Sequence, residues 1–324
     1  MQNRIVIITG AKSGIGKAAA LKFATEGYTV VMACRNMEVS KKVQEEIIAS
    51  SKNKNVDLME LDVSSFKSIR HFCEQYKKRY EKLDILIHNA AYVEHGAKHR
   101  LSVDGIELTF ATNVVGPYLM TQLLLDHLKK SDEARILNSG SNIIKHYFDP
   151  KKKIDFKTLQ GENNDPKFSV YNMYRQSKIA FMMLTFKMAD EFKNDGIKVN
   201  ALQVNGAKLS KETLNKFTLR WRIIGRIQSA FLRPTEYMAN NYYEICTSEK
   251  FKETTGKLLN DKLEIMESAT GEDLGFIEEV KQAVGSSVYP AYTDDKVTTE
   301  KVWGFCKNWT EKYTTDQKME SIKV

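Results

Sequence analysis

Proline, cysteine and long apolar runs are all scarce in this chain of 324 residues. Five prolines and 17 glycines exclude a collagen-like or broadly disordered chain. No apolar run approaches the roughly 20 residues of a membrane-spanning helix, and the first run, Ile5–Thr9, is also too short for a secretion signal. The four cysteines form no Cys-x-x-Cys pair and the six histidines form no His-Glu-x-x-His motif. We therefore expect neither a metal site nor a disulfide framework, and we expect a reducing compartment.

Basic residues outnumber acidic ones by 49 to 41, which gives a net charge of +8. An excess of this size favours anionic partners in general. The lysines and arginines are nevertheless spread along the whole chain, and only short clusters such as Lys151-Lys152-Lys153 occur. Because a nucleic-acid footprint needs a concentrated basic stripe, we interpret the excess as a solvated lysine-rich surface and expect no nucleic-acid partner.

Short apolar runs alternate with longer amphipathic segments as far as residue 204. The runs predict buried strands, because strands of a parallel sheet are apolar on both faces. The segments between them predict helices, so the fold class is α/β with a doubly wound, Rossmann-type parallel sheet. The expected strands are residues 4–8, 28–34, 56–61, 83–88, 135–139 and 197–204, and the expected helices are residues 14–25, 39–49, 65–80, 103–129 and 171–192.

A glycine-rich loop joins the first expected strand to the first expected helix. Its glycines permit a tight turn and let the backbone approach a phosphate at the helix N-terminus, where N–H groups and the helix dipole favour anions. The spacing differs from the usual dinucleotide fingerprint Gly-x-Gly-x-x-Gly. We predict that this loop binds the pyrophosphate of a dinucleotide through Gly10, Lys12, Ser13, Gly14, Ile15 and Gly16.

The spacing resembles the Thr-Gly-x-x-x-Gly-Ile-Gly motif of the short-chain dehydrogenase/reductase family. Further positions match in the family's order: Asn89-Ala90-Ala91 follows the fourth strand where the family has Asn-Asn-Ala-Gly, although His88 and Ala91 depart from it. After the sixth strand, Asn205-Gly206 stands where the family has Pro-Gly, and Ser210 replaces a Thr that contacts the nicotinamide. The resemblance implies that Asn89, Ala90, Ala91, Asn205, Gly206 and Ser210 lie against the cofactor.

Four more residues match the family's catalytic tetrad: Asn113, Ser141, Tyr174 and Lys178. A free tyrosine has a pKa of about 10 and is a poor base near neutrality. Because Lys178 shares a helix face with Tyr174, its ammonium would lower the tyrosine pKa. The resemblance implies that both residues also contact the cofactor. Ser141 would hold the substrate oxygen; Ser139 is its rival, and the family register favours Ser141. For Asn113 the resemblance implies support of a helix bend and of a water leading to Lys178.

Within the family the likeness is greatest to the retinol dehydrogenase-like group, and it covers roughly residues 3 to 260. It rests on Met32-Ala33-Cys34-Arg35-Asn36, on Leu61-Asp62-Val63-Ser64-Ser65 and on the stretch from Gly105 to Asn113. The resemblance implies an oxidoreductase that interconverts a hydrophobic alcohol and its aldehyde or ketone, such as a retinoid, isoprenoid or steroid. A dinucleotide-binding scaffold without turnover and a membrane-associated lipid-binding protein stay open as alternatives.

The end of the second expected strand decides the choice of cofactor. Enzymes that select NAD(H) place a carboxylate there, whereas an arginine accommodates the 2′-phosphate of NADP(H). The sequence has Arg35-Asn36 and no acidic residue before Glu38, which favours NADP(H) over NAD(H). An ordinary surface arginine is the alternative for Arg35. Asp62-Val63 is expected over the adenine, as in the family, and capping of the next helix is the alternative for Asp62.

We expect one domain over residues 1–324, with the dinucleotide-binding and catalytic core in about residues 1–205. We interpret residues 145–169 as a looped insertion at the mouth of the site, residues 206–250 as a substrate lid and residues 251–324 as a C-terminal extension. The segment 218–233 mixes apolar side chains with four arginines. The segment fits a lid over a hydrophobic substrate, a helix lying on a membrane surface, or ordinary packing against the rest of the protein. A homodimer is compatible with the sequence. The expected location is the cytoplasm, with peripheral contact to an internal membrane as the alternative.

Overall fold

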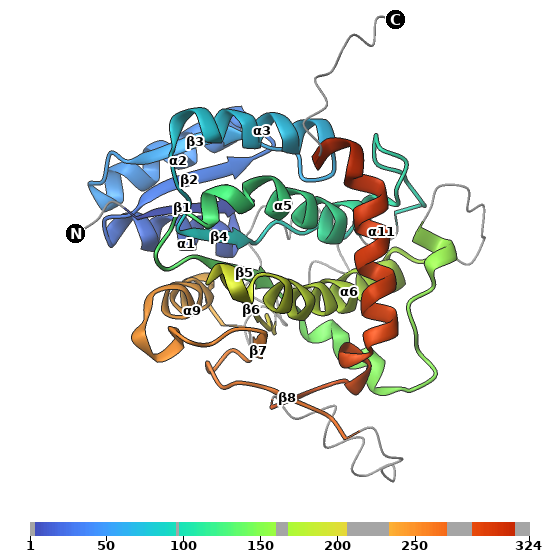
Figure 1. Cartoon of the computed structure of the whole chain (residues 1–324). Coiled ribbons are helices and arrows are strands. Elements are labelled where there is room, and N and C mark those ends of the chain that lie inside the picture. The colour runs from blue at the N-terminus through green and yellow to red at the C-terminus, as the bar shows by residue number, and fades with distance from the viewer. Residues whose placement is uncertain (1–3, 95–96, 160–167, 206–232, 271–286, 315–324) are drawn as a thin grey trace, which may run out of the picture.

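The computed structural model describes residues 4–94, 97–159, 168–205, 233–270 and 287–314. Within these ranges a seven-stranded sheet has the order β3-β2-β1-β4-β5-β6-β7, and all neighbouring strands are parallel (Figure 1). This order confirms the predicted doubly wound sheet. It reverses between β1 and β4, so the carboxyl ends of these strands flank the crevice where such sheets bind ligands. The strands are β1 Ile5–Thr9, β2 Thr29–Cys34, β3 Val56–Glu60, β4 Ile85–His88, β5 Arg135–Ser139, β6 Lys198–Leu202 and β7 Lys257–Leu259.

Helices cover both faces of the sheet. Val6 and Ile8 of β1 pack in one apolar cluster and Ile5 and Ile7 pack in the other, because successive side chains of a strand point to opposite faces. None of the helices in the described ranges is long and apolar enough to cross a membrane. The first cluster includes α1 Gly14–Thr25, α2 Met37–Ser51 and α9 Thr235–Thr247; the second includes α3 Phe66–Arg79, α5 Gly116–Leu128, α6 Val170–Glu191 and α11 Lys296–Thr314.

The predicted helix over residues 103–129 begins later than expected. Gly105 has a φ of +84°, and Leu101 and Glu107 form an antiparallel bridge, so the chain turns back before the helix. Glu107 then caps the short helix α4, Leu108–Phe110, by accepting from the Phe110 N–H at 2.9 Å. The helix continues as a π-helical turn, Ala111–Val115, before α5 begins. The apolar periodicity of residues 103–129 predicted one continuous helix, because periodicity alone does not distinguish an α-helix from a turn or a π-helical segment.

More regular structure follows residue 205 than the sequence pattern indicates. α9 packs on α1, and β7 adds a parallel strand beside β6. α11 packs on α3, α5 and α6, as the red helix of Figure 1 shows. β7 has only three residues, which is too short for a periodic pattern to stand out. The predicted lid region, residues 206–250, includes α9. Because α9 belongs to the layer that covers the sheet, the lid prediction applies only to the residues before α9.

The described residues of the predicted insertion, 145–159 and 168–169, lie in short 3₁₀ helices and in loops. Two short 3₁₀ helices, Asn142–Phe148 and Phe156–Leu159, lie at its start and in its middle. Two further short strands, β8 Glu267–Ser268 and β9 Val288–Tyr289, pair in parallel outside the main sheet. The part of the chain that follows β9 contacts the segment 145–169 through aromatic side chains. The rings of Tyr292 and Tyr147 stack with their centroids 5.6 Å apart.

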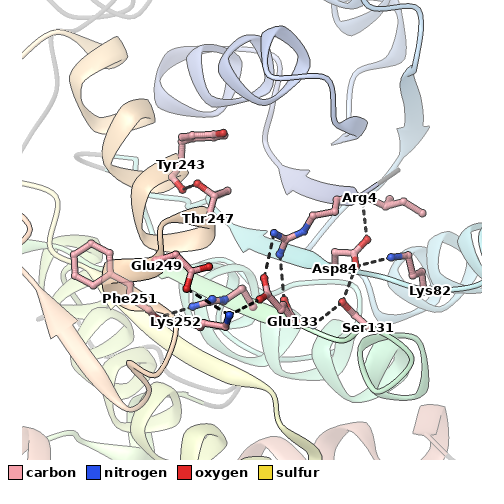
Figure 2. A network of polar contacts seen from close by, with 12 residues as sticks. Arg4, Lys82, Asp84, Ser131, Glu133, Tyr243, Thr247, Glu249, Phe251 and Lys252 are labelled. Atoms are coloured by element: carbon pink, nitrogen blue, oxygen red, sulfur yellow. Dashed lines mark hydrogen bonds and ion pairs between the residues drawn. The ribbon is translucent and has the colours of Figure 1, made fainter. Parts of the chain in front are cut away.

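A polar network closes the amino-terminal end of the sheet (Figure 2). Asp84, which is buried, accepts from the backbone N–H of Ile5 at 2.8 Å and from Ser131 Oγ at 2.6 Å. Glu133 pairs with Arg4 at 3.4 Å and with Lys252 at 3.3 Å. The network thus fixes the starts of β1, β4 and β5 relative to one another, at the end of the sheet opposite the glycine loop.

Candidate active site

The glycine loop lies at the carboxyl end of β1 and leads into α1. Gly10 and Gly14 have φ values of +68° and +56°, which favour glycine. A Cβ on Gly16 would lie 2.5 Å from Asn89 Nδ2 and 2.6 Å from Gly10 O, so glycine is required there. The Ser13 side chain makes no capping hydrogen bond, and the first turn of α1 holds no acidic residue. The loop therefore fits a phosphate group at the start of α1.

Thr9 joins this loop to the end of β4. Its Oγ1 accepts from the Asn89 and Ala90 N–H groups at 3.0 and 2.9 Å, and its carbonyl accepts from Asn89 Nδ2 at 2.9 Å. A Cβ on Gly10 would approach the Ala90 Cα to 3.1 Å. The Asn89-Ala90 pair thus sets the width of the crevice between β1 and β4, and Ala91 follows directly.

His88, a departure from the family pattern, has a structural role. The Thr121 hydroxyl donates to Pro117 O at 2.9 Å, so His88 Nε2–H donates to Thr121 Oγ1, also at 2.9 Å. The imidazole is buried, which lowers its pKa to about 3. A buried, neutral ring that bonds to Thr121 through Nε2 stands here in place of the asparagine.

Arg35 and Asp62 face each other across the ends of β2 and β3. Arg35 Nη1 lies 3.9 Å from Asp62 Oδ2, and the Arg35 side chain is 72% exposed. Asp62 Oδ1 accepts from the N–H and the hydroxyl of Ser64 at 2.9 and 2.7 Å, whereas Ser65 caps α3. Asp62 therefore orders the turn before α3 while its second oxygen faces Arg35.

Two neighbours of this pair have packing or capping contacts of their own. Asn36 caps α2 by accepting from the Val39 N–H at 3.0 Å. Val63 is buried, and a Cβ on Gly116 would clash with Val63 O, at 2.1 Å. Lys12 lies near enough to Cys34 to act on its thiol electrostatically. The residues that we predict to bind the cofactor after β1, β2 and β3 thus lie along the carboxyl end of the sheet.

Tyr174, Ser141 and Lys178 meet at the carboxyl end of β5. The Tyr174 hydroxyl hydrogen-bonds the Ser141 side chain, and burial raises the Tyr174 pKa. Lys178 Nζ donates to Ser139 O at 2.8 Å and lies 5.8 Å from the centre of the Tyr174 ring. Lys178 is buried, which lowers its pKa to about 8. The arrangement puts a phenol, a hydroxyl and an amine close together at the end of β5, and it can transfer a proton to or from a bound oxygen.

Asn113 lies in the π-helical turn and is buried. Its Nδ2 donates to Tyr92 O and to Ser177 Oγ, both at 3.0 Å, and its Oδ1 accepts from the Tyr92 N–H at 2.7 Å. The side chain therefore joins the loop after β4 to α6. π-Helical turns often occur at functional sites, and this one carries the Asn113 side chain that bonds to Ser177 of α6.

Tyr242 of α9 is a site residue that the sequence analysis missed. Its hydroxyl hydrogen-bonds the Ser139 side chain and donates to Asn89 Oδ1 at 3.4 Å. Ser139 thus lies beside Tyr242, whereas Ser141 lies beside Tyr174. No sequence signal marked Tyr242, since α9 lies in the part of the chain where no pattern was recognised.

Several predicted residues lie elsewhere or outside the described ranges. Asn205 donates from Nδ2 to Asp261 Oδ1 at 3.0 Å. Gly206, Ser210 and residues 218–232 fall outside those ranges, while Arg233, the last residue of the expected lid segment, lies over the Tyr237 ring. No group of three or more potential metal ligands occurs among the residues that the structure describes.

Comparisons with known proteins agree with the family resemblance described for the sequence. Residues 4–149 match the family model of the short chain dehydrogenases. The chain is 32% identical to retinol dehydrogenase 13 of Homo sapiens over 78% of this chain and 75% of that protein. It is 34% identical to retinol dehydrogenase 12 of Mus musculus over 80% of this chain and 78% of that protein. A short chain dehydrogenase from Escherichia coli CFT073, complexed with NADPH, superposes with a TM-score of 0.62 at 20% identity over 81% of this chain and 98% of that chain.

Proposed function

Because the chain belongs to the short-chain dehydrogenase/reductase family, in its retinol dehydrogenase-like group, and is an oxidoreductase, we propose that it interconverts a hydrophobic alcohol and its aldehyde or ketone with NADP(H). The hydrogen bond between the Tyr174 hydroxyl and Ser141, beside the buried Lys178, carries the proposal. The names of the relatives support a lipid alcohol such as a retinoid, with isoprenoids and steroids as the neighbouring classes.

Ser141 and Tyr174 act on the reacting oxygen of the substrate. Ser141 donates a hydrogen bond to that oxygen and holds it against the Tyr174 hydroxyl. Tyr174 removes the hydroxyl proton of an alcohol, or supplies a proton to a carbonyl oxygen in the reverse direction. Burial raises the Tyr174 pKa, so a nearby positive charge is needed to stabilise its phenolate. Lys178, 5.8 Å from the ring centre, supplies that charge when it is protonated.

The cofactor, when bound, supplies or accepts the hydride. Its pyrophosphate would lie against the glycine loop, where Gly10, Gly14 and Gly16 leave room for the approach. Arg35 would hold the 2′-phosphate, because its exposed guanidinium has only a 3.9 Å contact with Asp62. The E. coli neighbour complexed with NADPH supports this choice. Lys178 uses one N–H on Ser139 O and would direct its remaining N–H groups to the ribose.

A substrate panel run with both cofactors tests the proposal. Retinoid, isoprenoid and steroid alcohols and carbonyls are incubated with the purified protein and NADPH or NADP⁺, and again with NADH or NAD⁺, while nicotinamide absorbance is followed. We expect turnover with at least one lipid class and faster turnover with NADP(H). Cofactor binding without turnover of any substrate would support the scaffold alternative. Turnover that prefers NAD(H) would overturn the role of Arg35.

The lid over residues 218–233, the homodimer and the peripheral membrane contact stay predictions from the sequence. A lid there would explain selection for long substrates, because its apolar side chains would contact the substrate. The same panel, run with chains of increasing length, reports on it. A lid predicts a KM that falls as the substrate lengthens.

A further inference from the structure

A cavity lies beside α6, along a different face of the helix from the one that carries Tyr174. Its volume is about 450 Å³, within the range of small-ligand sites, and it opens between the first turns of α6 and the segment 146–158. Ser169, Asn172, Met173 and Gln176 line it. These residues are three or four apart and share one helix face, whereas Tyr174 and Lys178 lie on another. The cavity is therefore distinct from the tetrad.

Cations dominate the ionisable side chains of this cavity. Lys152, Lys153 and Arg175 line it together with His146, and the lining holds one carboxylate, Asp155. Asp155 is engaged locally, because its Oδ1 accepts from the Lys157 N–H at 3.0 Å. The cavity is thus positively charged near neutral pH. Two of its lysines come from the Lys151-Lys152-Lys153 cluster, which the proposed reaction does not use.

These cations have weak or uncharged partners among the described residues. Lys153 Nζ lies 4.0 Å from the centre of the Tyr292 ring, and Lys152 Nζ lies 3.9 Å from Asp149 Oδ2. Arg175 stacks on the Tyr171 ring at 4.3 Å and donates from Nη1 to Asn172 Oδ1 at 3.0 Å. Within the described part of the cavity, no carboxylate lies at hydrogen-bonding distance from Lys152, Lys153 or Arg175.

Arg175 carries a donor that lacks an acceptor. Its Nε is buried, and no described residue accepts from it. A buried N–H without a partner is unfavourable, so an acceptor atom of a bound ligand would be favoured there. Burial lowers the pKa of His146, and the charges of Arg175 and Lys152 lower it further. Arg175 and Lys152 thus act electrostatically on His146, and all three side chains line the same cavity.

The cavity also has an apolar wall, formed by Tyr147, Phe168 and Met173. We propose that it binds a phosphate monoester, with the phosphate held by Lys152, Lys153 and Arg175 and the organic group against Tyr147 and Phe168. Arginine matches the fork of phosphate oxygens and lysine adds point charges, which suits a dianion better than a monocarboxylate. This inference does not depend on the proposed reaction.

Calorimetric titration with phenyl phosphate tests the proposal on the full chain. The titration is run without NADP⁺ and with saturating NADP⁺, so that the glycine loop does not compete for the probe. We expect binding in both conditions, and an affinity about tenfold lower for the double variant Lys152→Gln/Lys153→Gln. Lys151→Gln is the matched control, because Lys151 belongs to the same cluster but does not line the cavity. We expect it to bind like the wild type.

Neutral and inorganic probes separate the two halves of the site. Benzyl alcohol should bind far more weakly than phenyl phosphate, and inorganic phosphate should bind more weakly than the ester. Equal affinity for inorganic and phenyl phosphate would overturn the monoester assignment. Absence of binding, loss of binding when NADP⁺ is present, or an equal loss in Lys151→Gln and the double variant would overturn the site itself.

Discussion

Asn113 and Tyr174 are joined through the hydroxyl of Ser177. Asn113 Nδ2 donates to Ser177 Oγ at 3.0 Å, and Ser177 Oγ donates to the carbonyl oxygen of Tyr174 at 2.8 Å. Because the hydroxyl hydrogen is used on Tyr174, its oxygen is left to accept from the amide. The π-helical turn is thus tied to the turn of α6 that carries the predicted acid/base residue.

Ser177→Ala should therefore reduce turnover although Ser177 touches neither substrate nor cofactor in our proposal. We expect kcat to fall about tenfold and stability to fall by about 1–3 kcal/mol, since a buried amide donor loses its acceptor. Thr185→Val is the matched control: Thr185 accepts from Asn138 at 2.9 Å and donates to Phe181 O at 2.8 Å, in the same pattern two turns later. It should lose stability without losing kcat. Equal kcat in both variants would contradict the link.

Tyr174→Phe should leave dinucleotide binding nearly unchanged and lower kcat by about 10²–10⁴-fold, because it removes the proton donor and keeps the ring. Steady-state kinetics and cofactor titration measure the two effects. Tyr171→Phe, one turn earlier and exposed, should behave like the wild type. If Tyr174→Phe retained more than about a tenth of the activity, the acid/base assignment would fail.

Lys178→Met should abolish turnover and raise stability. Burial lowers the Lys178 pKa from 10.5 to about 8, so the folded state below pH 8 bears the cost of a buried charge. We expect a gain of up to about 3 kcal/mol at pH 7 that shrinks as the pH rises toward 10.5, where the unfolded lysine also loses its proton. Thermal melts over this range measure it. Lys187→Met is the control, since Lys187 pairs with Glu191 and Glu300 and its pKa is raised; it should show no such gain.

Arg35→Asp should weaken NADP(H) binding more than NAD(H) binding, because a repulsive charge replaces an attractive one beside the 2′-phosphate. We expect the preference to shift by about tenfold or more. Cofactor titration by fluorescence measures both affinities. Arg79→Asp, an equal charge change at the exposed end of α3, should leave the ratio unchanged. Equal losses for both cofactors in Arg35→Asp would make Arg35 a structural residue.

Glu107→Gln should become progressively more stable than the wild type as the pH rises. Burial raises the Glu107 pKa from 4.5 to about 7, so the stability it contributes is full below pH 4.5 and is lost as the pH rises through 7. The variant is neutral throughout, and its advantage should reach about 1–3 kcal/mol at pH 8. Melting temperatures between pH 4.5 and 8 test this. The exposed Glu45→Gln should show no such trend; a flat difference for Glu107→Gln would contradict the burial effect.

The sequence predicted the sheet and the glycine-rich loop between β1 and α1 because both rest on local patterns. Strands such as Ile85–His88 are buried on both faces and read as apolar runs, and the glycines of the loop occur where φ is positive or a Cβ would clash. It did not predict the late start of the helix after Gly105, since periodicity does not report a single turn. It also missed Ser177 and Tyr242, whose contacts reach across 64 and 153 residues of chain and leave no local signature.

The position of α11 has a consequence for synthesis. The Trp303 ring packs edge-on against Tyr118 at 5.0 Å, and the Phe305 ring packs against Phe110 at 5.6 Å. The chain leaves the ribosome from its N-terminus, so α4 and α5 emerge more than half a chain length before the helix that covers them. Until α11 arrives, these aromatic rings are left without their partners, and apolar surface of this kind attracts chaperones and other nascent chains. Translation of the last described helix is thus the step at which the nascent protein becomes able to close its own core.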